Sequence, residues 1–549
     1  MLRLLVVGLA VFSLSCVKRT PEGQRPDIVV VAKRIHTNDP KLPFATAFVV
    51  RGDRIAFVGD EAGAVAFASS DAVIDRFPES TIVPGLADAH GHLASLGRAA
   101  SIVSLDGMTS AADVTARIEK ATPAAFQGDW LLGRGWDQND WTQKTFPTRA
   151  LLDATKPTTP IFFSRVDGHA AWVNGEALKR AGITKDTKDP QGGKILRDEK
   201  GEPTGVLIDN AIDLVSAKIP EPTQLERERR LKVALELCAK LGLTSVHDAG
   251  MDLATFQLLQ RWDLGGLLPI RIYAMADGQS SGWEGFVERG VTTGGLLELR
   301  AVKLLADGAL GSRGAALHAP YSDEPTSSGL LLLTPEELEE RAKAFDARGF
   351  QVAVHAIGDR ANTLVIDVLS KLDKQHRHRV EHVQVLRGDD VARLAQSGLI
   401  ASMQPTHATS DMPWAEARVG KERLSFAYAW RAMLDAKVPL AFGSDFPVEH
   451  PNPLWGLYSA RTRQDHQGQP AEGWTKSQRL TGAEALAAFT TGAAFASFAE
   501  TSRGRLTVGF DADFVVLPVD PVDGDPKALL DAKVQMTVVR GMDVFRATP

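Results

Sequence analysis

Short apolar runs alternate with stretches of helical periodicity through most of this chain. Helical spacing is clearest at residues 334–348 and 482–498. Eight apolar runs have the length of buried β-strands, at residues 81–86, 243–247, 270–274, 299–305, 350–355, 379–382, 400–403 and 438–442. Strands that alternate with helices predict a parallel sheet covered by helices, and a closed barrel requires eight such strands. We therefore expect an α/β fold built on a (β/α)8 TIM barrel.

The two ends of the chain share a different pattern of short β-type runs. They lie at residues 27–32, 47–50 and 55–58 near the start, and at 513–517 and 534–539 near the end. Hairpin signals stand at Arg51-Gly52-Asp53 and at Arg540-Gly541-Met542-Asp543. We expect 27–80 and 500–549 to form one small composite β domain that flanks a barrel at 81–499. Residues 100–235 exceed a normal connection between barrel elements, so we expect a large inserted subdomain after the first barrel strand.

The first residues have the pattern of an export signal. A short positive start precedes an apolar run at 4–14 that is too short to span a bilayer. Ser13-Leu14-Ser15-Cys16 resembles a bacterial lipoprotein signal, and an ordinary cleaved signal with an incidental cysteine is the alternative. We expect a signal peptide at 1–16, a tether at 17–26, and export to the cell envelope or periplasm with a lipid anchor on Cys16. The other cysteine, Cys238, is expected to be a buried apolar residue.

Composition and charge narrow the class of partner. The chain has 549 residues, of which 44% are hydrophobic and 24% charged, so it can bury a large core. Its formal net charge is only −6 and it has no basic stripe, which argues against nucleic acid as a partner. The expected partner is a small-molecule substrate, with membrane contact only through the N-terminal anchor. Homo-oligomerisation stays open.

The candidate chemistry starts with two histidines after the first run. His90 and His92 are two residues apart, so in an extended segment both side chains point the same way. Either they bind one divalent metal or they are incidental histidines in a turn. His355, His382 and Asp445 also end or follow strand-like runs. A TIM barrel places its strand ends around one rim, so these donors are expected to converge on a metal site.

Lys303 lies inside the apolar run at 299–305, where its ammonium would lose hydration. Either the side chain faces outward and reaches solvent, or its amine is carbamylated by carbon dioxide to give a carboxylate that bridges two cations.

These residues belong to motifs that resemble the amidohydrolase superfamily, in particular its N-substituted formamide deformylase-like branch. The matching motifs lie at 83–92, 133–137, 167–170, 242–250, 302–308, 354–359, 381–382 and 443–445. The resemblance runs from about residue 27 to 545. It implies two divalent metals, usually zinc, with His90, His92 and Asp445 holding the more buried ion. It also implies that His355 and His382 hold the other ion, with carbamylated Lys303 between the two. A single metal with an unmodified lysine stays open.

The resemblance implies hydrolysis of a non-peptide C–N bond, such as an N-acyl or N-formyl amine, with Asp445 as the catalytic acid and base. A hydrolase of a lactone, ester or phosphoester on the same site is the alternative, followed by a non-catalytic binding protein.

Three further residues are candidates for substrate binding, each with a structural alternative. His247 ends the second run and could orient a substrate, His169 could reach across from the insertion, and Arg313 could bind a substrate carboxylate. Trp136, Trp141 and Trp172 are expected to form the core of the insertion. Four other histidines show no relation to strand ends and are expected on the surface; they are His36, His376, His378 and His466.

Overall fold

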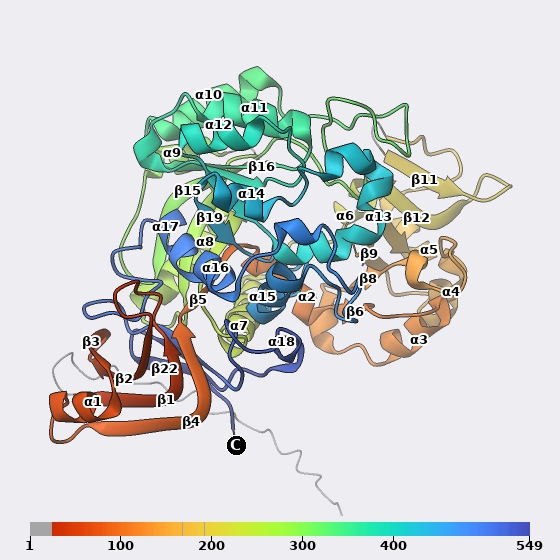
Figure 1. Cartoon of the computed structure of the whole chain (residues 1–549). Helices are drawn as coiled ribbons and strands as arrows, with labels where there is room; N and C mark the ends of the chain where they lie inside the picture. Colours follow the sequence, from red (N-terminus) through yellow and green to blue (C-terminus); the bar gives the residue numbers. More distant parts are fainter. Residues whose placement is uncertain (1–24, 167, 169, 191–192, 281, 549) are drawn as a thin grey trace, which may run out of the picture.

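The structure is a computed structural model that describes residues 25–548 apart from 167, 169, 191–192 and 281. The predicted signal peptide at 1–16, most of the tether at 17–26, and His169 therefore lie outside the described residues. Three sheets organise the rest. Figure 1 shows the barrel in the centre, a β domain at its lower left and an insertion at its right.

The central sheet has eight parallel strands whose order around the barrel follows the chain. The strands are β5 (Leu86–Gly91), β13 (Leu243–Met251), β14 (Arg271–Asp277), β15 (Leu297–Leu305), β16 (Gln351–Ala356), β17 (Arg379–His382), β18 (Ile400–Met403) and β19 (Leu440–Phe442). The segment after β19 brings the two ends of the sheet together, because His92 N donates to Phe446 O at 2.9 Å and Asp445 N donates to His90 O at 2.7 Å. The barrel is therefore nearly closed, and the predicted α/β barrel is confirmed.

Helices follow the barrel strands and cover the outside of the sheet (Figure 1). They are α2 (Leu93–Ser101), α7 (Gln224–Lys240), α8 (Leu253–Leu264), α9 (Glu284–Arg289), α10 (Pro335–Asp346), α11 (Asp359–Leu369), α12 (Asp390–Ser397), α13 (Pro405–Leu424), α14 (Trp430–Asp435), α15 (Pro453–Thr462), α16 (Gly482–Ala487), α17 (Ala493–Ala496) and α18 (Ala528–Asp531), with short turns η3 (Lys374–His376), η4 (Lys476–Gln478) and η5 (Ala488–Gly492). Reciprocal Thr–Glu capping boxes begin α7, α10 and α16. Each box satisfies backbone N–H groups that have no partner inside the helix.

The second sheet joins both ends of the chain, with strand order β22-β21-β20-β4-β1-β2-β3. Its strands are β1 (Ile28–His36), β2 (Phe44–Arg51), β3 (Arg54–Gly59), β4 (Val73–Pro84), β20 (Phe514–Leu517), β21 (Met536–Val539) and β22 (Met542–Arg546), and α1 (Glu61–Phe67) packs on it. The hairpin between β2 and β3 turns at residues 52–53, as predicted. Arg271, at the start of β14, joins this sheet to the barrel by ion pairs with Asp511 at 2.8 Å and Asp513 at 2.7 Å.

The predicted first run, 81–86, is wrong as one barrel strand. Residues 81–84 are the end of β4 in the composite sheet, and the barrel strand β5 begins at Leu86. Gly85 separates the two, and a Cβ atom at this position would lie 2.3 Å from Thr244 Oγ1. The chain therefore changes sheets at a point where only a glycine fits.

The insertion has its own sheet, with strand order β11-β12-β10-β9-β8-β6 and β7 paired to β8. Its elements are β6 (Val103–Ser104), α3 (Ala111–Glu119), η1 (Pro123–Ala125), β7 (Phe126–Gln127), β8 (Trp130–Trp136), η2 (Gln138–Asp140), α4 (Arg149–Thr155), β9 (Ile161–Arg165), β10 (Ala170–Val173), α5 (Gly175–Ala181), β11 (Gly193–Arg197), β12 (Pro203–Asp209) and α6 (Asp213–Ser216). Trp136, Trp141 and Trp172 are buried in its core, as expected.

The predicted C-terminal limit of the insertion, residue 235, is too late. Helix α7 begins at Gln224, and its Leu231 and Leu235 pack in the core of the barrel. This core also buries Cys238, which confirms the expectation for that cysteine. Among the described residues, no helix combines the length and apolar character that a membrane crossing requires.

Candidate metal centre

The predicted ligands converge at the carboxyl end of the barrel. His90 lies in β5, Lys303 in β15, His355 in β16 and His382 at the end of β17. Lys303 Nζ lies 3.0 Å from His90 Nε2. The ring centroid of His382 lies 4.8 Å from that of His90 and 4.5 Å from that of His355. These residues are far apart in sequence and meet because parallel strands end at one rim.

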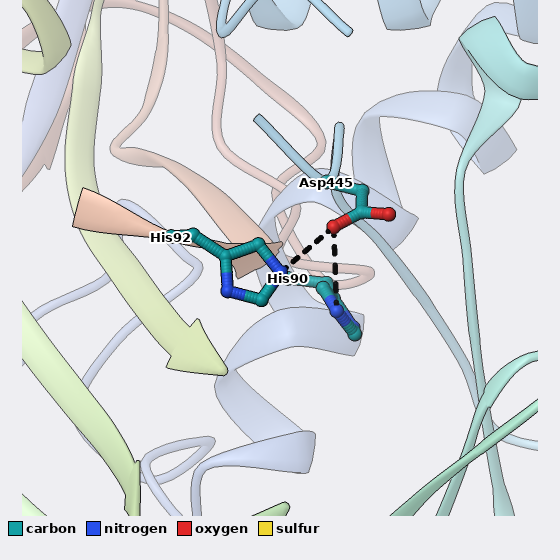
Figure 2. Close-up of side chains that lie close together, drawn as sticks. All are labelled: His90, His92 and Asp445. Atoms are coloured by element: carbon teal, nitrogen blue, oxygen red, sulfur yellow. Dashed lines mark hydrogen bonds and ion pairs between the residues drawn. The ribbon is translucent and has the colours of Figure 1, made fainter. Parts of the chain in front are cut away.

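Asp445 follows β19 and completes this cluster. Its Oδ1 atom lies 3.0 Å from His92 Nε2 and 3.6 Å from His90 Nε2, as Figure 2 shows. Asp445 has a φ of +59°, in the left-handed region that costs a non-glycine residue free energy. Burial alone would raise the pKa of this carboxyl, but the nearby imidazoles, His90 first, hold it well below its usual range. Asp445 is therefore an anion that faces the Nε2 atoms of His90 and His92.

The sequence suggested that His90 and His92 both follow the first barrel strand, but only His92 does. His90 is inside β5 and fully buried, whereas His92 is the N-cap residue of α2 and its side chain is 32% exposed. The two rings still approach each other, with centroids 5.5 Å apart. His92 is thus the member of the cluster that is open to solvent.

The hydrogen bonds of the imidazoles leave the correct nitrogens free for a metal. His90 Nδ1 lies 2.5 Å from Glu381 Oε2, and His382 Nδ1 lies 2.8 Å from Gln404 Oε1. Both oxygens only accept, so each Nδ1 carries the proton and each Nε2 presents its lone pair. His355 Nε2 lies 3.4 Å from the carbonyl oxygen of Gly308, which favours a proton on Nε2 and a free Nδ1. Partners of this kind orient metal-binding histidines in proteins.

Burial supports the same protonation states. It lowers the pKa of His90 to about 4 and that of His355 to about 3, and the nearby Lys303 adds to both shifts. Burial also lowers the pKa of His382 well below its usual value. The three rings are therefore neutral near pH 7, as metal ligands must be.

Lys303 faces the interior of the barrel and not solvent. It is 4% exposed, and this burial lowers the pKa of its amine. The outward-facing alternative for Lys303 is therefore wrong.

Glu381 anchors His90 from below the cluster. Its Oε1 atom forms an ion pair with Arg379 Nε at 2.7 Å, and both side chains are fully buried. Burial alone would raise the pKa of Glu381, but the Arg379 guanidinium and His90 hold it well below its usual range. Arg379 also donates to Ala89 O at 2.6 Å and to Ser402 Oγ at 2.8 Å. The orientation of His90 is thus fixed by a network that crosses the barrel.

Asp88 fixes the segment that carries Asp445. Its carboxylate accepts from Ser444 N at 3.1 Å and from Ser444 Oγ at 2.6 Å. Burial raises the pKa of Asp88 to about 7. Gly443 allows the close approach, because a Cβ atom there would lie 2.5 Å from His90 N.

Two of the predicted substrate-binding residues are engaged elsewhere. His247 does not end its strand: β13 continues to Met251, and His247 Nδ1 accepts a hydrogen bond from Arg379 inside the barrel at 3.0 Å. Arg313 forms a two-pronged pair with Asp323, at 3.1 and 2.9 Å. Arg313 therefore holds the loop after β15, and its role in binding a substrate carboxylate stays a prediction. The prediction for His169 falls outside the described residues.

The sequence analysis missed three residues of the centre, namely Glu381, Gln404 and His407. Glu381 directly precedes a predicted ligand inside an apolar strand, and a carboxylate there was a usable signal. Gln404 and His407 lie within four residues of the end of β18. His407 is already part of a helix, so a pattern of donors at strand ends does not predict it.

Two other histidine–carboxylate groups lie away from the barrel rim. They contain His378 and His36, which were predicted to lie on the surface but are buried. His378 is 2% exposed, and its Nδ1 accepts from Val352 N at 3.0 Å. Its Nε2 must then carry the proton and point to Asp346 at 3.3 Å, which excludes it as a neutral metal ligand. His36 is 4% exposed and pairs with Asp520 at 2.9 Å. His36 Nε2 has a hydrogen-bond partner in Asp520, whereas His378 Nε2 has only the ion-pair contact with Asp346.

Comparison with known proteins agrees with this arrangement. Residues 80–545 match the description "Amidohydrolase family". The chain belongs to the amidohydrolase family. It is therefore a metal-dependent hydrolase with a small-molecule substrate, and its histidine and aspartate cluster supplies residues that can bind the metal.

Relatives within the family cover nearly the whole chain. The chain is 34% identical to YtcJ of Bacillus subtilis (strain 168) over 85% of its own length and 89% of that protein. It is 28% identical to an N-substituted formamide deformylase of Arthrobacter pascens, over 96% and 99%. A crystal structure of an uncharacterized metal-dependent hydrolase from Pyrococcus horikoshii OT3 superposes with a TM-score of 0.76 at 28% identity, covering 91% of this chain and 99% of that one.

Proposed function

We propose that this amidohydrolase cleaves a non-peptide C–N bond, in an N-acyl or N-formyl amine, with two zinc ions held by His90, His92, Lys303, His355, His382 and Asp445. The observation that carries the proposal is the position of Asp445. Its Oδ1 faces the nitrogens of His90 and His92, and its backbone is held by His90 O. Neutral imidazoles with one free nitrogen, next to a carboxylate, form the donor set that zinc prefers.

The ions would be held in two groups of residues. His90, His92 and Asp445 would hold one ion, and His355 and His382 would hold the other, with Lys303 between them. A divalent ion bound here lowers the pKa of a water molecule and polarises a carbonyl oxygen.

Lys303 is proposed to carry a carbamate. Its Nζ would form a bond to the carbon of carbon dioxide and release a proton, which leaves an anionic carboxylate on the side chain. The support is its position, 3.0 Å from His90 Nε2 and buried where an ammonium is poorly solvated. A carboxylate here would give the buried cluster a second anion beside Asp445.

Asp445 is proposed to move the proton during the reaction. The attacking water gives its proton to Asp445 as its oxygen bonds to the carbonyl carbon. Asp445 then delivers that proton to the departing nitrogen when the C–N bond breaks. Glu381 and Gln404 support this role, because they keep the imidazole protons of His90 and His382 on the side of each ring away from Nε2.

The substrate class rests on the relative named as an N-substituted formamide deformylase. That protein's name describes an N-substituted formamide substrate. We propose the same bond type here.

The test is metal analysis combined with hydrolysis of a panel of formamides, N-acyl amines, lactones and phosphoesters. We expect close to two zinc ions per chain and hydrolysis of linear amides. Asp445→Asn should lower kcat by about 10²–10⁴-fold, as loss of a general acid–base group does, with metal retained. Asp389→Asn, an exposed carboxylate, is the matched control. Full activity without metal, or cleavage of esters alone, would reject the proposal.

For location we propose export with a lipid on Cys16, on the basis of residues 1–16. Fatty-acid labelling of the wild type but not of Cys16→Ser would support it, and label in both would contradict it.

A further inference from the structure

His407 has a buried nitrogen that nothing in the described part of the chain binds. It lies in the first turn of α13, three residues after Gln404, and is 9% exposed. Its Nε2 atom has no hydrogen-bond partner among the described residues. An unpaired buried polar atom is costly, and such atoms are rare in folded proteins. One that faces a candidate active site therefore indicates a missing ligand.

The surroundings of His407 show where this nitrogen points. Its Nε2 lies 3.8 Å from Asp445 Oδ2, which is too long for a hydrogen bond. Its ring is parallel to that of His382, with an interplanar angle of 13° and centroids 6.0 Å apart. Asp445 uses its other oxygen, Oδ1, to face His90 and His92. The unpartnered nitrogen of His407 is thus beside the aspartate oxygen that does not face those two histidines.

Two kinds of ligand could satisfy His407 Nε2, a metal ion or a substrate oxygen. Ligand atoms of His382, His407 and Asp445 lie within 4.8 Å of one another, so an ion is geometrically conceivable. However, six other residues already supply candidate ligands, and His407 faces Asp445 Oδ2, whereas His90 and His92 face Oδ1. A group that reacts between the metal centre and Asp445 Oδ2 would come within reach of His407.

We propose that His407 is a catalytic residue that donates a hydrogen bond from Nε2 to the carbonyl oxygen of the substrate. This inference rests on the proposed hydrolytic function. When the oxygen of water bonds to the carbonyl carbon, the π electrons of the C=O bond move to its oxygen. The Nε2–H group of His407 stabilises the resulting negative charge, and the electrons return to re-form C=O as the C–N bond breaks.

The experiment compares three variants with the wild type on the best substrate of the panel, whether amide or ester. His407→Phe keeps a flat ring without a donor, and His407→Gln places an amide N–H near the position of Nε2. His318→Phe removes an exposed histidine that contacts Thr363 and serves as control. We measure kcat, KM, zinc content and the melting temperature of each protein.

We expect His407→Phe to lower kcat by about 10²–10³-fold, with KM within about threefold and zinc content unchanged. His407→Gln should recover at least a tenth of the wild-type kcat, and His318→Phe should match the wild type. A His407→Phe enzyme with wild-type kcat would overturn the proposal. Loss of an ion from this variant would overturn it in favour of a metal-ligand role.

The outcomes separate the two proposals. An esterase without amidase activity whose kcat depends on His407 would reject the proposed bond type and keep the role of His407. An active amidase that tolerates His407→Phe would do the reverse. If zinc-loaded wild type hydrolyses nothing on the panel, both proposals fail.

Discussion

Glu381→Gln is the substitution that most directly tests how the fold prepares His90 for a metal. In the wild type, one carboxylate oxygen lies 2.5 Å from His90 Nδ1 and the other 2.7 Å from Arg379 Nε. Glutamine has nearly the same shape but only one accepting oxygen. Its NH2 group must then face either the N–H of His90 or the guanidinium of Arg379, and both are donors.

The size of the effect follows from which contact is lost. If the amide faces His90, the ring favours the tautomer with its proton on Nε2, the nitrogen that the metal needs. Outer partners of this kind contribute about 10–100-fold in metal affinity, which corresponds to about 1.4–2.7 kcal/mol. In either orientation the fully buried guanidinium of Arg379 loses its counter-ion, because glutamine is neutral. Removal of one partner of a buried ion pair costs about 3–5 kcal/mol of stability.

The assay titrates zinc into metal-free protein against a chromophoric chelator, and follows urea unfolding of the same metal-free samples. Glu298→Gln is the matched control, since Glu298 also pairs with an arginine, Arg503, at 3.2 Å but away from the ligands. We expect weaker zinc binding, lower stability, or both for Glu381→Gln, and wild-type zinc affinity for the control. Wild-type affinity and stability in Glu381→Gln would refute the reasoning.

Three further substitutions test other parts of the structure. Gly443→Ala should destabilise the protein by more than about 2 kcal/mol and lower activity, because the new Cβ would lie 2.5 Å from His90 N; wild-type thermal stability would contradict this. Arg313→Ala should cost less than about 1 kcal/mol and should not selectively impair carboxylate-bearing substrates; a selective rise in their KM would instead support its predicted role. Glu484 has its pKa lowered to about 2, first by its hydrogen bond to Arg431. Its contribution to stability is therefore present above the ordinary glutamate pKa and lost as pH falls towards 2. Because the pair is partly exposed, we expect Glu484→Gln to be about 1 kcal/mol less stable at pH 7 and equal to the wild type near pH 2, as measured by urea unfolding across pH; a constant gap would contradict the assignment.

The sequence predicted the barrel well because its strands are buried on both faces. Such strands are continuous apolar runs, and seven of the eight were found; six have boundaries within three residues of the structure, and the run at 243–247 ends four residues too early. The exception is the run at 81–86, which is apolar throughout although the chain passes from one sheet to another at Gly85. The apolar character of a residue indicates that it is buried, but it does not indicate which of two sheets the residue belongs to.

The convergence of the proposed ligands could be predicted where a donor ends or closely follows a strand, as His382 and Asp445 do. The contacts between side chains could not be predicted from the sequence. Arg313 and Asp323 are ten residues apart on a loop, and the sequence gives no sign that they pair. His247 was placed at the rim because the predicted run ended there, but the strand continues through Asp248, which is buried and accepts a hydrogen bond from Leu93 N at 3.0 Å.

The composite sheet can be completed only late in the synthesis of the chain, because it combines strands from both ends. Strand β4 is made early, yet its neighbour β20 begins at Phe514. Until then β4 presents an unpaired edge, which is a site for aggregation in a nascent chain. Arg271 likewise has no counter-ions until Asp511 and Asp513, more than two hundred residues later in the chain, have been made. A chain that is cut short before residue 511 therefore keeps every proposed metal ligand. It leaves Arg271 without its counter-ions and β4 with an unpaired edge, so cellular quality control should recognise it as incompletely folded.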